Sequence, residues 1–369
     1  MRIFAAAAFL LATAPLAPAP LAAQVSTAWP VTEGDAILKN FRFHTGETLP
    51  ELRMHYRTLG SPQRDSRGRI TNAIMFLHGT GGTGAQFLRP QFADELFGPG
   101  QPLDISQYWI ILPDSIGHGG SSKPSDGLRV AFPKYDYDDM VEAQRRLLQE
   151  HLGVDHLRLL GGTSMGCMHS FVWGTTHPGF ATALFPTACL PVEIAGRNRM
   201  WRKMSIDAIK ADPLWNNGNY TTQPMGGLRT AAVLGVIAGS APLRMQAEAP
   251  TREAAEKGLE ERVRAGMNDD ANDVIYRLDS SRNYNPAPTL ARITVPVTWI
   301  NSADDFINPP ELGIAEREVT KMPNARFILI PESAETRGHS THTWAMFWKQ
   351  DLADLLNRTQ SPQAGSSPH

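Results

Sequence analysis

A serine flanked by glycines follows an apolar run that is typical of a buried strand. The stretch LRLLGGTSMGCMHSF covers residues 157–171 and places Ser164 between Gly162 and Gly166. A nucleophilic serine on a tight strand-to-helix turn has strained backbone angles, and glycines two residues to either side let the strand and the helix approach closely. The pattern therefore predicts that Ser164 is the nucleophile of an acyl-transfer reaction.

Such a serine needs a base that takes its proton and an acid that orients the base. In sheets that carry this turn, the chain order is nucleophile, acid, histidine. Two histidines, in RGHSTHTW, lie between the last predicted strand and the last predicted helix. His339 is the preferred base because Gly338 frees the backbone beside it, and His342 is the second candidate. For the acid, Asp304 and Asp305 both follow a predicted strand, and one of the two can equally be a loop cap.

The attacked carbonyl becomes an oxyanion, which needs backbone N–H donors already in place. We expect one donor to be Met165, directly after the nucleophile. We expect the other in the stretch FLHGTGGTGAQF, where Gly79 or Thr80 offers its amide.

Residues 79–84 also match G-x-G-x-x-G, the dinucleotide-binding fingerprint. That interpretation needs an acid about twenty residues further on, at the end of a strand, but Asp104 precedes a predicted strand. It also leaves the order of serine, acid and histidine unexplained, so no nucleotide cofactor is predicted. His339 and His342 are accompanied by no HExxH helix and no further ligand cluster, so no metal is predicted either.

Short apolar runs alternate with helical patterns on both sides of a purely helical region. This alternation predicts a parallel sheet with helices on both faces, interrupted by a helical insertion. Strands are expected at 72–78, 108–113, 157–162, 293–300 and 326–331, and helices at 137–152 and 342–356. The predicted organisation is a signal peptide (1–23), a core in two parts (24–190 and 286–357), a helical lid (191–285) and a disordered tail (358–369).

The composition is that of a globular protein: 369 residues, 42% hydrophobic and 20% charged. A net charge of −2 with mixed signs offers no basic stripe for nucleic acid or anionic lipid, so we expect a small-molecule ester or acyl donor as partner. The N-terminal run is too short and too rich in proline for a stable membrane span. It resembles a signal peptide cleaved after Ala23, which predicts a periplasmic or secreted protein.

Export would place the two cysteines, Cys167 and Cys189, in an oxidising compartment where they could pair. Two small buried apolar residues are an equally good interpretation, because sequence alone does not place the two close together.

Several stretches together resemble the α/β-hydrolase fold and, within it, the homoserine O-acetyltransferase family. They include GPGQPLDISQYWIILPDSIGHGGSSKPS, LLGGTSMGCMHSFVWGTTHP and DFINPPEL, and AIKADPLWNNGNY in the lid is the most family-specific. The resemblance implies a mostly parallel central sheet with helices on both faces, a helical lid and a homodimer through that lid. It also implies that Ser164 accepts the acyl group, that Asp305 rather than Asp304 is the acid, and that His339 is the base.

The chain departs from that family at positions beside the predicted site. Thr163 and Cys167 replace glycines, which predicts a tighter pocket. Ser340 stands where the family has an aspartate suited to a substrate ammonium, and Ala232 where it has an arginine for a substrate carboxylate. Arg229, one helical turn earlier, is a candidate replacement, and together with Ser340 it forms the predicted substrate-binding set.

Loss of both charged partners disfavours homoserine as acceptor. The preferred hypothesis is therefore an exported serine hydrolase of carboxylic esters. The alternative is an O-acyltransferase of the homoserine O-acetyltransferase type, with an acyl-CoA donor and an alcohol acceptor. A non-catalytic binding protein is a third hypothesis, against which the complete set of serine, acid and histidine argues.

Overall fold

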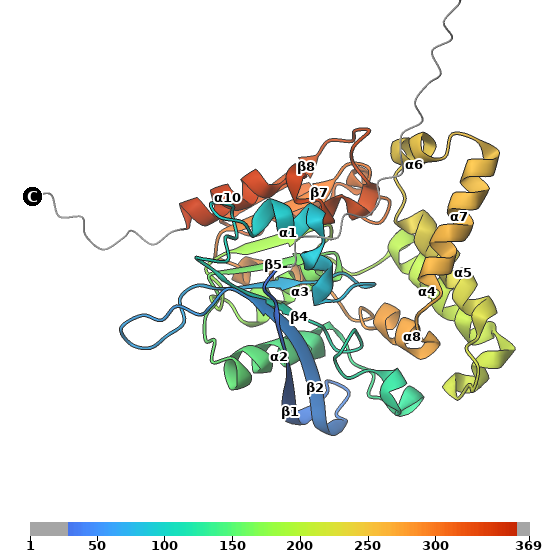
Figure 1. Ribbon diagram of the computed structural model, residues 1–369, viewed down its shortest axis with the longest axis horizontal. Coiled ribbons are helices and arrows are strands. Elements are labelled where there is room, and N and C mark those ends of the chain that lie inside the picture. The colour runs from blue at the N-terminus through green and yellow to red at the C-terminus, as the bar shows by residue number, and fades with distance from the viewer. Residues whose placement is uncertain (1–28, 360–369) are drawn as a thin grey trace, which may run out of the picture.

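The computed structural model describes residues 29–359, which form a central eight-stranded sheet flanked by helices (Figure 1). The strand order is β1-β2-β4-β3-β5-β6-β7-β8. The neighbours of β2 run antiparallel to it and all other pairs are parallel, which confirms the predicted fold class. The strands are β1 (Thr32–Arg42), β2 (Thr48–Leu59), β3 (Ala73–Leu77), β4 (Trp109–Pro113), β5 (Leu159–Thr163), β6 (Leu184–Thr187), β7 (Val297–Ser302) and β8 (Ala325–Ile330).

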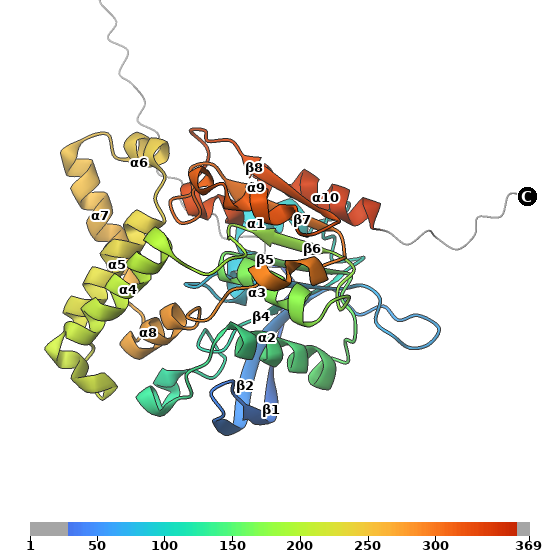
Figure 2. The ribbon, with the colours of Figure 1, turned by 180° about the vertical axis from the view of Figure 1, so that it is seen from behind.

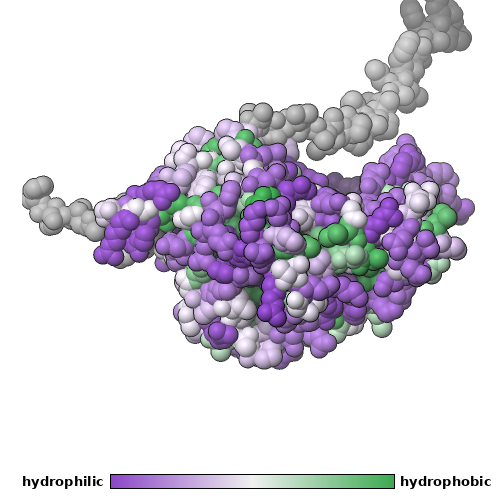
Figure 3. Space-filling view, turned by 90° about the horizontal axis from the view of Figure 1, so that it is seen from below, coloured by the Kyte–Doolittle hydropathy of each residue, from purple (hydrophilic) through white to green (hydrophobic). Residues whose placement is uncertain are grey.

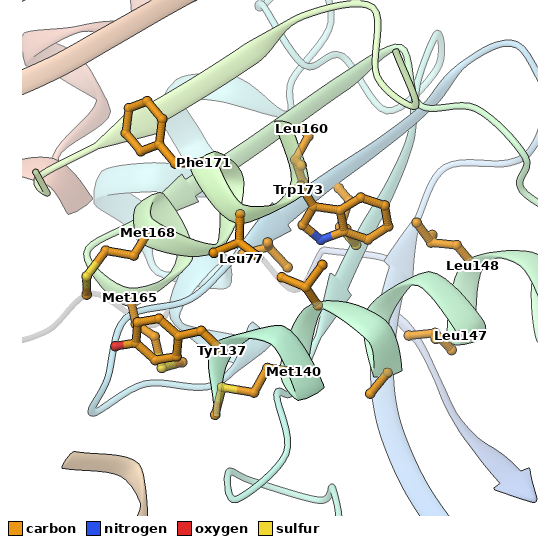
Figure 4. Close-up of a cluster of buried hydrophobic side chains, with 14 of the residues drawn as sticks. Leu77, Tyr137, Met140, Leu147, Leu148, Leu160, Met165, Met168, Phe171 and Trp173 are labelled. Carbon is orange, nitrogen blue, oxygen red and sulfur yellow. The ribbon is translucent and has the colours of Figure 1, made fainter. Parts of the chain in front are cut away.

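The central strands are buried on both faces because helices cover both sides (Figure 2). In β3, Ile74 and Phe76 join a cluster with α1 (Pro90–Leu96) and α10 (Lys349–Arg358). Met75 and Leu77 point to the other face, since side chains alternate along a strand. They join a cluster with α2 (Tyr137–Arg146), α3 (Met165–Thr176) and α9 (Ile314–Val319), part of which is drawn in Figure 4.

A separate group of helices, lying to one side of the sheet in Figure 1, forms the lid. It has its own small apolar core, which includes Ile206, Ile209, Leu228, Ala271 and Ile275. The lid helices are α4 (Gly196–Ala211), α5 (Met225–Ala238), α6 (Pro242–Glu248), α7 (Arg252–Gly266) and α8 (Ala271–Asp279).

The lid exposes several large apolar side chains, and green hydrophobic residues appear toward its side of the face shown in Figure 3. These side chains are Met200, Met204, Leu214, Met225, Ile237, Leu243 and Leu259. A homodimer through the lid stays a prediction.

Between residues 29 and 359, no individual helix is long and apolar enough to cross a membrane. Taken together, α5 and α6 reach that length and apolarity, but the chain bends by 109° between them. The predicted signal peptide and residues 360–369 of the predicted tail lie outside the described residues.

Candidate active site

Ser164 sits on the turn that joins β5 to α3, with φ 55° and ψ −109°. A non-glycine residue with positive φ is strained, and such strain is concentrated at functional sites. The flanking glycines are required by packing: a Cβ on Gly162 would lie 2.1 Å from the Gly166 carbonyl oxygen, and one on Gly166 would lie 1.9 Å from the Leu77 carbonyl oxygen. The two glycines thus allow strand and helix to meet at the angle that presents Ser164.

The structure brings Ser164, His339 and Asp305 into one hydrogen-bonded chain. The Ser164 hydroxyl lies 2.8 Å from His339 Nε2, and His339 Nδ1 lies 2.8 Å from Asp305 Oδ2. Because an ionised carboxylate only accepts, Nδ1 carries the imidazole proton and Nε2 is free to accept from the serine. This is the arrangement that nucleophilic catalysis by serine requires.

Asp305 follows β7 and is buried. Its Oδ1 accepts from the backbone N–H groups of Ile307 and Asn308, and its Oδ2 accepts from the Asn308 side-chain amide at 3.0 Å. Burial alone would raise the pKa of this carboxyl, but the charge of His339 and the hydrogen bonds from His339 and Asn308 lower it overall. Asp305 is therefore held as a carboxylate next to the imidazole.

The neighbouring Asp304 has a different set of partners. Its Oδ2 accepts from the Thr336 hydroxyl at 2.8 Å and from the Gly338 backbone N–H at 2.9 Å. Asp304 therefore ties the end of β7 to the loop that carries His339. The residue pattern does not choose between Asp304 and Asp305. In the structure, only Asp305 contacts the imidazole of His339.

His342, the second candidate base, lies behind His339. Its Nδ1 hydrogen-bonds the His339 carbonyl, and the two rings pack edge to face with centroids 5.0 Å apart. Burial and the neighbouring His339 lower the pKa of His342 to about 3. His342 thus supports the backbone at residue 339 and makes no contact with Ser164.

The predicted oxyanion donors lie around Ser164. A Cβ on Gly79 would be 3.4 Å from Ser164 Cβ, so the loop after β3 passes directly beside the serine. The Gly79 N–H already donates to Gln86 Oε1 at 3.3 Å. Among the described residues, the N–H groups of Thr80 and Met165 have no acceptor. Of the two candidates on the loop, Thr80 has the free donor.

Two buried histidines hold the carbonyl groups of this loop. His78 Nδ1 lies 2.8 Å from the Gly79 carbonyl oxygen, and His118 Nε2 lies 2.9 Å from the Thr80 carbonyl oxygen. Because a peptide unit is planar, fixing the Gly79 carbonyl also fixes the direction of the Thr80 N–H. The sequence pattern did not predict these roles, because the contact of His118 with Thr80 joins positions that are 38 residues apart in the chain.

Thr163 and Cys167, which stand where the homoserine O-acetyltransferase family has glycines, brace the turn. The Thr163 hydroxyl accepts a hydrogen bond from Gln86 Nε2 at 2.8 Å. Cys167 of α3 forms a disulfide with Cys189, which follows β6. The Cys189 carbonyl in turn accepts from Trp299 Nε1 at 3.0 Å, so the bridge connects the nucleophile helix to β7.

The predicted substrate-binding residues lie outside the hydrogen-bonded triad. Arg229 is exposed on α5 and pairs with Glu260 of α7 at 2.6 Å. Ser340 is exposed next to His339, and its backbone N–H donates to the Arg337 carbonyl. Ala232 packs against α7, where a Cβ on Gly266 would lie 3.2 Å from it.

One group of possible metal ligands lies within residues 29–359, and it is separate from the triad. Ligand atoms of His44, Asp136 and Asp138 lie within 4.8 Å of one another, and His44 already pairs with Asp136 at 2.9 Å.

Residues 72–336 match the family described as the alpha/beta hydrolase fold. The chain belongs to this family. A probable acyltransferase from Methanothermobacter thermautotrophicus is 28% identical over 276 residues, which are 74% of this chain and 83% of that protein. The homoserine O-acetyltransferase of Natronomonas pharaonis is 31% identical over 224 residues, which are 55% of this chain and 53% of that protein. The chain thus spans about half the length of this second relative.

Two solved structures share the fold of this α/β hydrolase over most of its length. The homoserine O-acetyltransferase from Bacillus anthracis superposes with a TM-score of 0.79 at 21% identity, covering 90% of this chain and 99% of its own. An acetylester hydrolase from Corynebacterium glutamicum superposes with a TM-score of 0.77 at 21% identity, covering 88% of this chain and 96% of its own. Within this enzyme family, the chain is thus similar to homoserine O-acetyltransferases in sequence and to a homoserine O-acetyltransferase and an acetylester hydrolase in fold.

Proposed function

We propose that this α/β hydrolase cleaves carboxylic esters through a covalent acyl-enzyme on Ser164. The observation that carries the proposal is the continuous chain from Ser164 through His339 to Asp305, with 2.8 Å at each link. His339 acts as the base, and Asp305 holds its ring and stabilises the imidazolium.

In the first half-reaction, Ser164 Oγ attacks the ester carbonyl carbon while its proton passes to His339 Nε2. The N–H groups of Met165 and Thr80 receive the oxyanion, since both lack an acceptor in the free protein. His339 then gives its proton to the alkoxide oxygen as the carbon–oxygen bond breaks. The alcohol leaves, and the acyl group remains on Ser164.

In the second half-reaction, a water molecule loses a proton to His339 Nε2 and attacks the acyl carbon. The oxyanion forms again between the same two N–H groups. As the bond to Ser164 breaks, His339 returns the proton to the serine oxygen and the carboxylic acid is released.

Water is favoured as acceptor by the residues that replace the family's charged positions. Ser340 and Ala232 offer no charge to an amino acid, and the guanidinium of Arg229 is paired with Glu260. An O-acyltransferase is the second candidate function, and it is supported by the names of the two curated relatives.

One experiment separates these functions. The protein and its Ser164→Ala variant are incubated with p-nitrophenyl acetate, with and without homoserine. We expect hydrolysis that depends on Ser164 and is unaffected by homoserine. Faster turnover with homoserine, together with formation of O-acetylhomoserine, would establish the transferase instead, and absence of turnover with every acyl ester would leave a binding protein.

We also propose that the enzyme works in the periplasm or is secreted. The Cys167–Cys189 disulfide beside the active site supports this, because structural disulfides persist in oxidising compartments. Mass spectrometry of protein recovered from each cell fraction and the medium is expected to find a chain that begins at Gln24. Recovery of the uncleaved chain from the cytoplasm would contradict export.

A further inference from the structure

A cavity of about 300 Å³ lies where the lid meets the core. Its wall is formed by residues of α4 and α8, by Trp215 of the lid, and by residues 130–135 of the core. Figure 1 shows α8 between the other lid helices and the core. Neither the triad nor the proposed oxyanion donors, Thr80 and Met165, belong to this wall. The cavity is therefore a second concave site, which the proposed ester hydrolysis does not use.

Hydrogen bonds between lid and core hold the wall of this cavity in place. The Tyr276 hydroxyl of α8 donates to the Phe132 carbonyl at 2.7 Å. Arg282, which follows α8, donates to the carbonyls of Lys134 and Tyr135 at 2.7 and 2.8 Å. Both sides of the wall are thus fixed to each other in the free protein. The cavity is preformed, as ligand sites usually are.

The wall of the cavity suits an aromatic ligand. Its apolar surface consists of three aromatic and three aliphatic side chains: Tyr135, Trp215, Tyr276, Val130, Ile206 and Ile275. Aromatic rings gain energy from packing on one another in offset or edge-to-face arrangements. An apolar cavity of about 150 Å³ holds one benzene molecule, so a cavity of twice that volume has room for two fused rings.

The wall also contains two lysines without a counter-charge, Lys134 and Lys210. In the described part of the chain, neither ammonium group has a carboxylate within 4.0 Å or a hydrogen-bond acceptor, although that of Lys210 lies 5.9 Å from the Trp215 ring centroid. Asp279, the acid of the wall, is 3.9 Å from Arg282 instead. Both lysines are exposed, so the charged part of the wall is accessible to solvent and to a ligand.

We propose that this cavity binds an aromatic carboxylate of about two rings. The ring system lies between lid and core, and the carboxylate pairs with Lys134 and Lys210. Asn272 of the wall adds no free donor or acceptor, because its amide accepts from Trp215 Nε1 at 3.0 Å and donates to the Gly218 carbonyl at 2.9 Å. A ligand held in this way contacts α4, α8 and residues 130–135 together, so it links the lid to the core.

Calorimetry with 2-naphthoate and its neutral analogue 2-naphthamide tests the site. We expect the wild type to bind the carboxylate roughly tenfold more tightly than the amide, and to bind benzoate more weakly because one ring fills only part of the cavity. Lys134→Gln and Lys210→Gln are each expected to weaken 2-naphthoate binding about three- to fivefold, as is usual for the loss of one exposed charge pair. The affinity for 2-naphthamide should stay nearly unchanged. Equal affinities of the wild type for carboxylate and amide would overturn the proposal.

The matched control is Lys203→Gln, the same change on α4, at an exposed lysine that pairs with Asp207 and is not part of the wall. It is expected to leave 2-naphthoate binding unchanged. Val130→Trp narrows the cavity and is expected to weaken 2-naphthoate binding at least tenfold; the Val130 side chain is 40% exposed, so this change does not disturb the core. Normal affinity in both lysine variants, or an equal loss in Lys203→Gln, would overturn the site.

Labelling of Ser164 with a serine-reactive fluorophosphonate separates this cavity from the reaction centre. The labelled protein is expected to bind 2-naphthoate with unchanged affinity, and loss of binding would place the carboxylate at the reaction centre and overturn the second site. Hydrogen exchange of the complex is expected to slow in residues 206–215 and 272–282 and to stay unchanged in residues 338–343. The lysine variants decide the point without any reaction at Ser164, so failure of the proposed ester hydrolysis would not affect it.

Discussion

Gln86 connects the oxyanion loop to the strand that presents the nucleophile, because its side-chain amide donates to the Thr163 hydroxyl at 2.8 Å. The oxygen of the same amide accepts from the Gly79 N–H. One side chain thus spans the two segments that must keep a constant separation while the oxyanion forms. It also occupies the Gly79 N–H, which leaves Thr80 as donor.

Removal of this link is expected to impair catalysis more than binding. We expect Gln86→Ala to lower kcat roughly fivefold with KM nearly unchanged, since loss of one such hydrogen bond costs about 1 kcal/mol. Steady-state kinetics with p-nitrophenyl acetate, normalised to sites titrated by a serine-reactive fluorophosphonate, measures this. Thr163→Val removes the same hydrogen bond from its other end and is expected to lower kcat in the same way. A normal kcat in both variants would contradict the bracing role.

The adjacent acids are expected to differ sharply. Asp305→Asn removes the charge that orients His339 and stabilises the imidazolium, so kcat should fall roughly a thousand- to ten-thousandfold. Asp304→Asn only weakens the ties to Thr336 and Gly338, and we expect a loss of about tenfold or less. Single-turnover rates on titrated sites compare the two, and losses of equal size would show that both acids act on the imidazole.

Asp273 gives the protein a pH-dependent stability. Burial raises the pKa of this carboxyl to about 6, although it accepts from the Ser125 N–H and hydroxyl across the contact between lid and core. A carboxyl whose folded pKa is raised binds its proton more tightly in the native state. It therefore stabilises the fold at low pH, and that contribution is lost as the pH rises through about 6.

Melting temperatures of the wild type and Asp273→Asn at pH 5 and pH 7.5 test this contribution. We expect the melting temperature of Asp273→Asn, relative to that of the wild type, to be higher at pH 7.5 than at pH 5, because the amide stays neutral. Asp279→Asn, on the same helix but more exposed, is the control. A difference that does not change with pH would refute the raised pKa.

The disulfide is expected to stabilise the turn that carries Ser164. It closes a segment with a sequence separation of 22, and loops of this length correspond to about 2–4 kcal/mol. Urea unfolding of the double variant Cys167→Ala/Cys189→Ala is expected to show a midpoint lowered accordingly. Reductant should lower the midpoint of the wild type and leave that of the double variant unchanged; equal midpoints without reductant would mean that the bridge adds no stability.

Strands with unbroken apolar runs were predicted within a few residues, whereas β1, β2 and β6 were not among the predicted strands. In β1, Ala36 and Leu38 are buried in alternation, but the next buried residue is Phe41. Asn40 has a left-handed backbone with φ 49°, which shifts the alternation by one residue. A period-2 pattern interrupted in this way does not stand out in the sequence.

The sequence by itself determined the α/β alternation, the helical lid and the chain order of serine, acid and histidine, because local residue patterns reflect backbone preference and burial. The residue pattern could not choose between Asp304 and Asp305, nor decide whether Cys167 and Cys189 pair. It also did not reveal that His78 and His118 hold the carbonyl groups of the oxyanion loop. Those outcomes depend on which segments the sheet order brings together, and contacts between distant segments leave no local trace in one sequence.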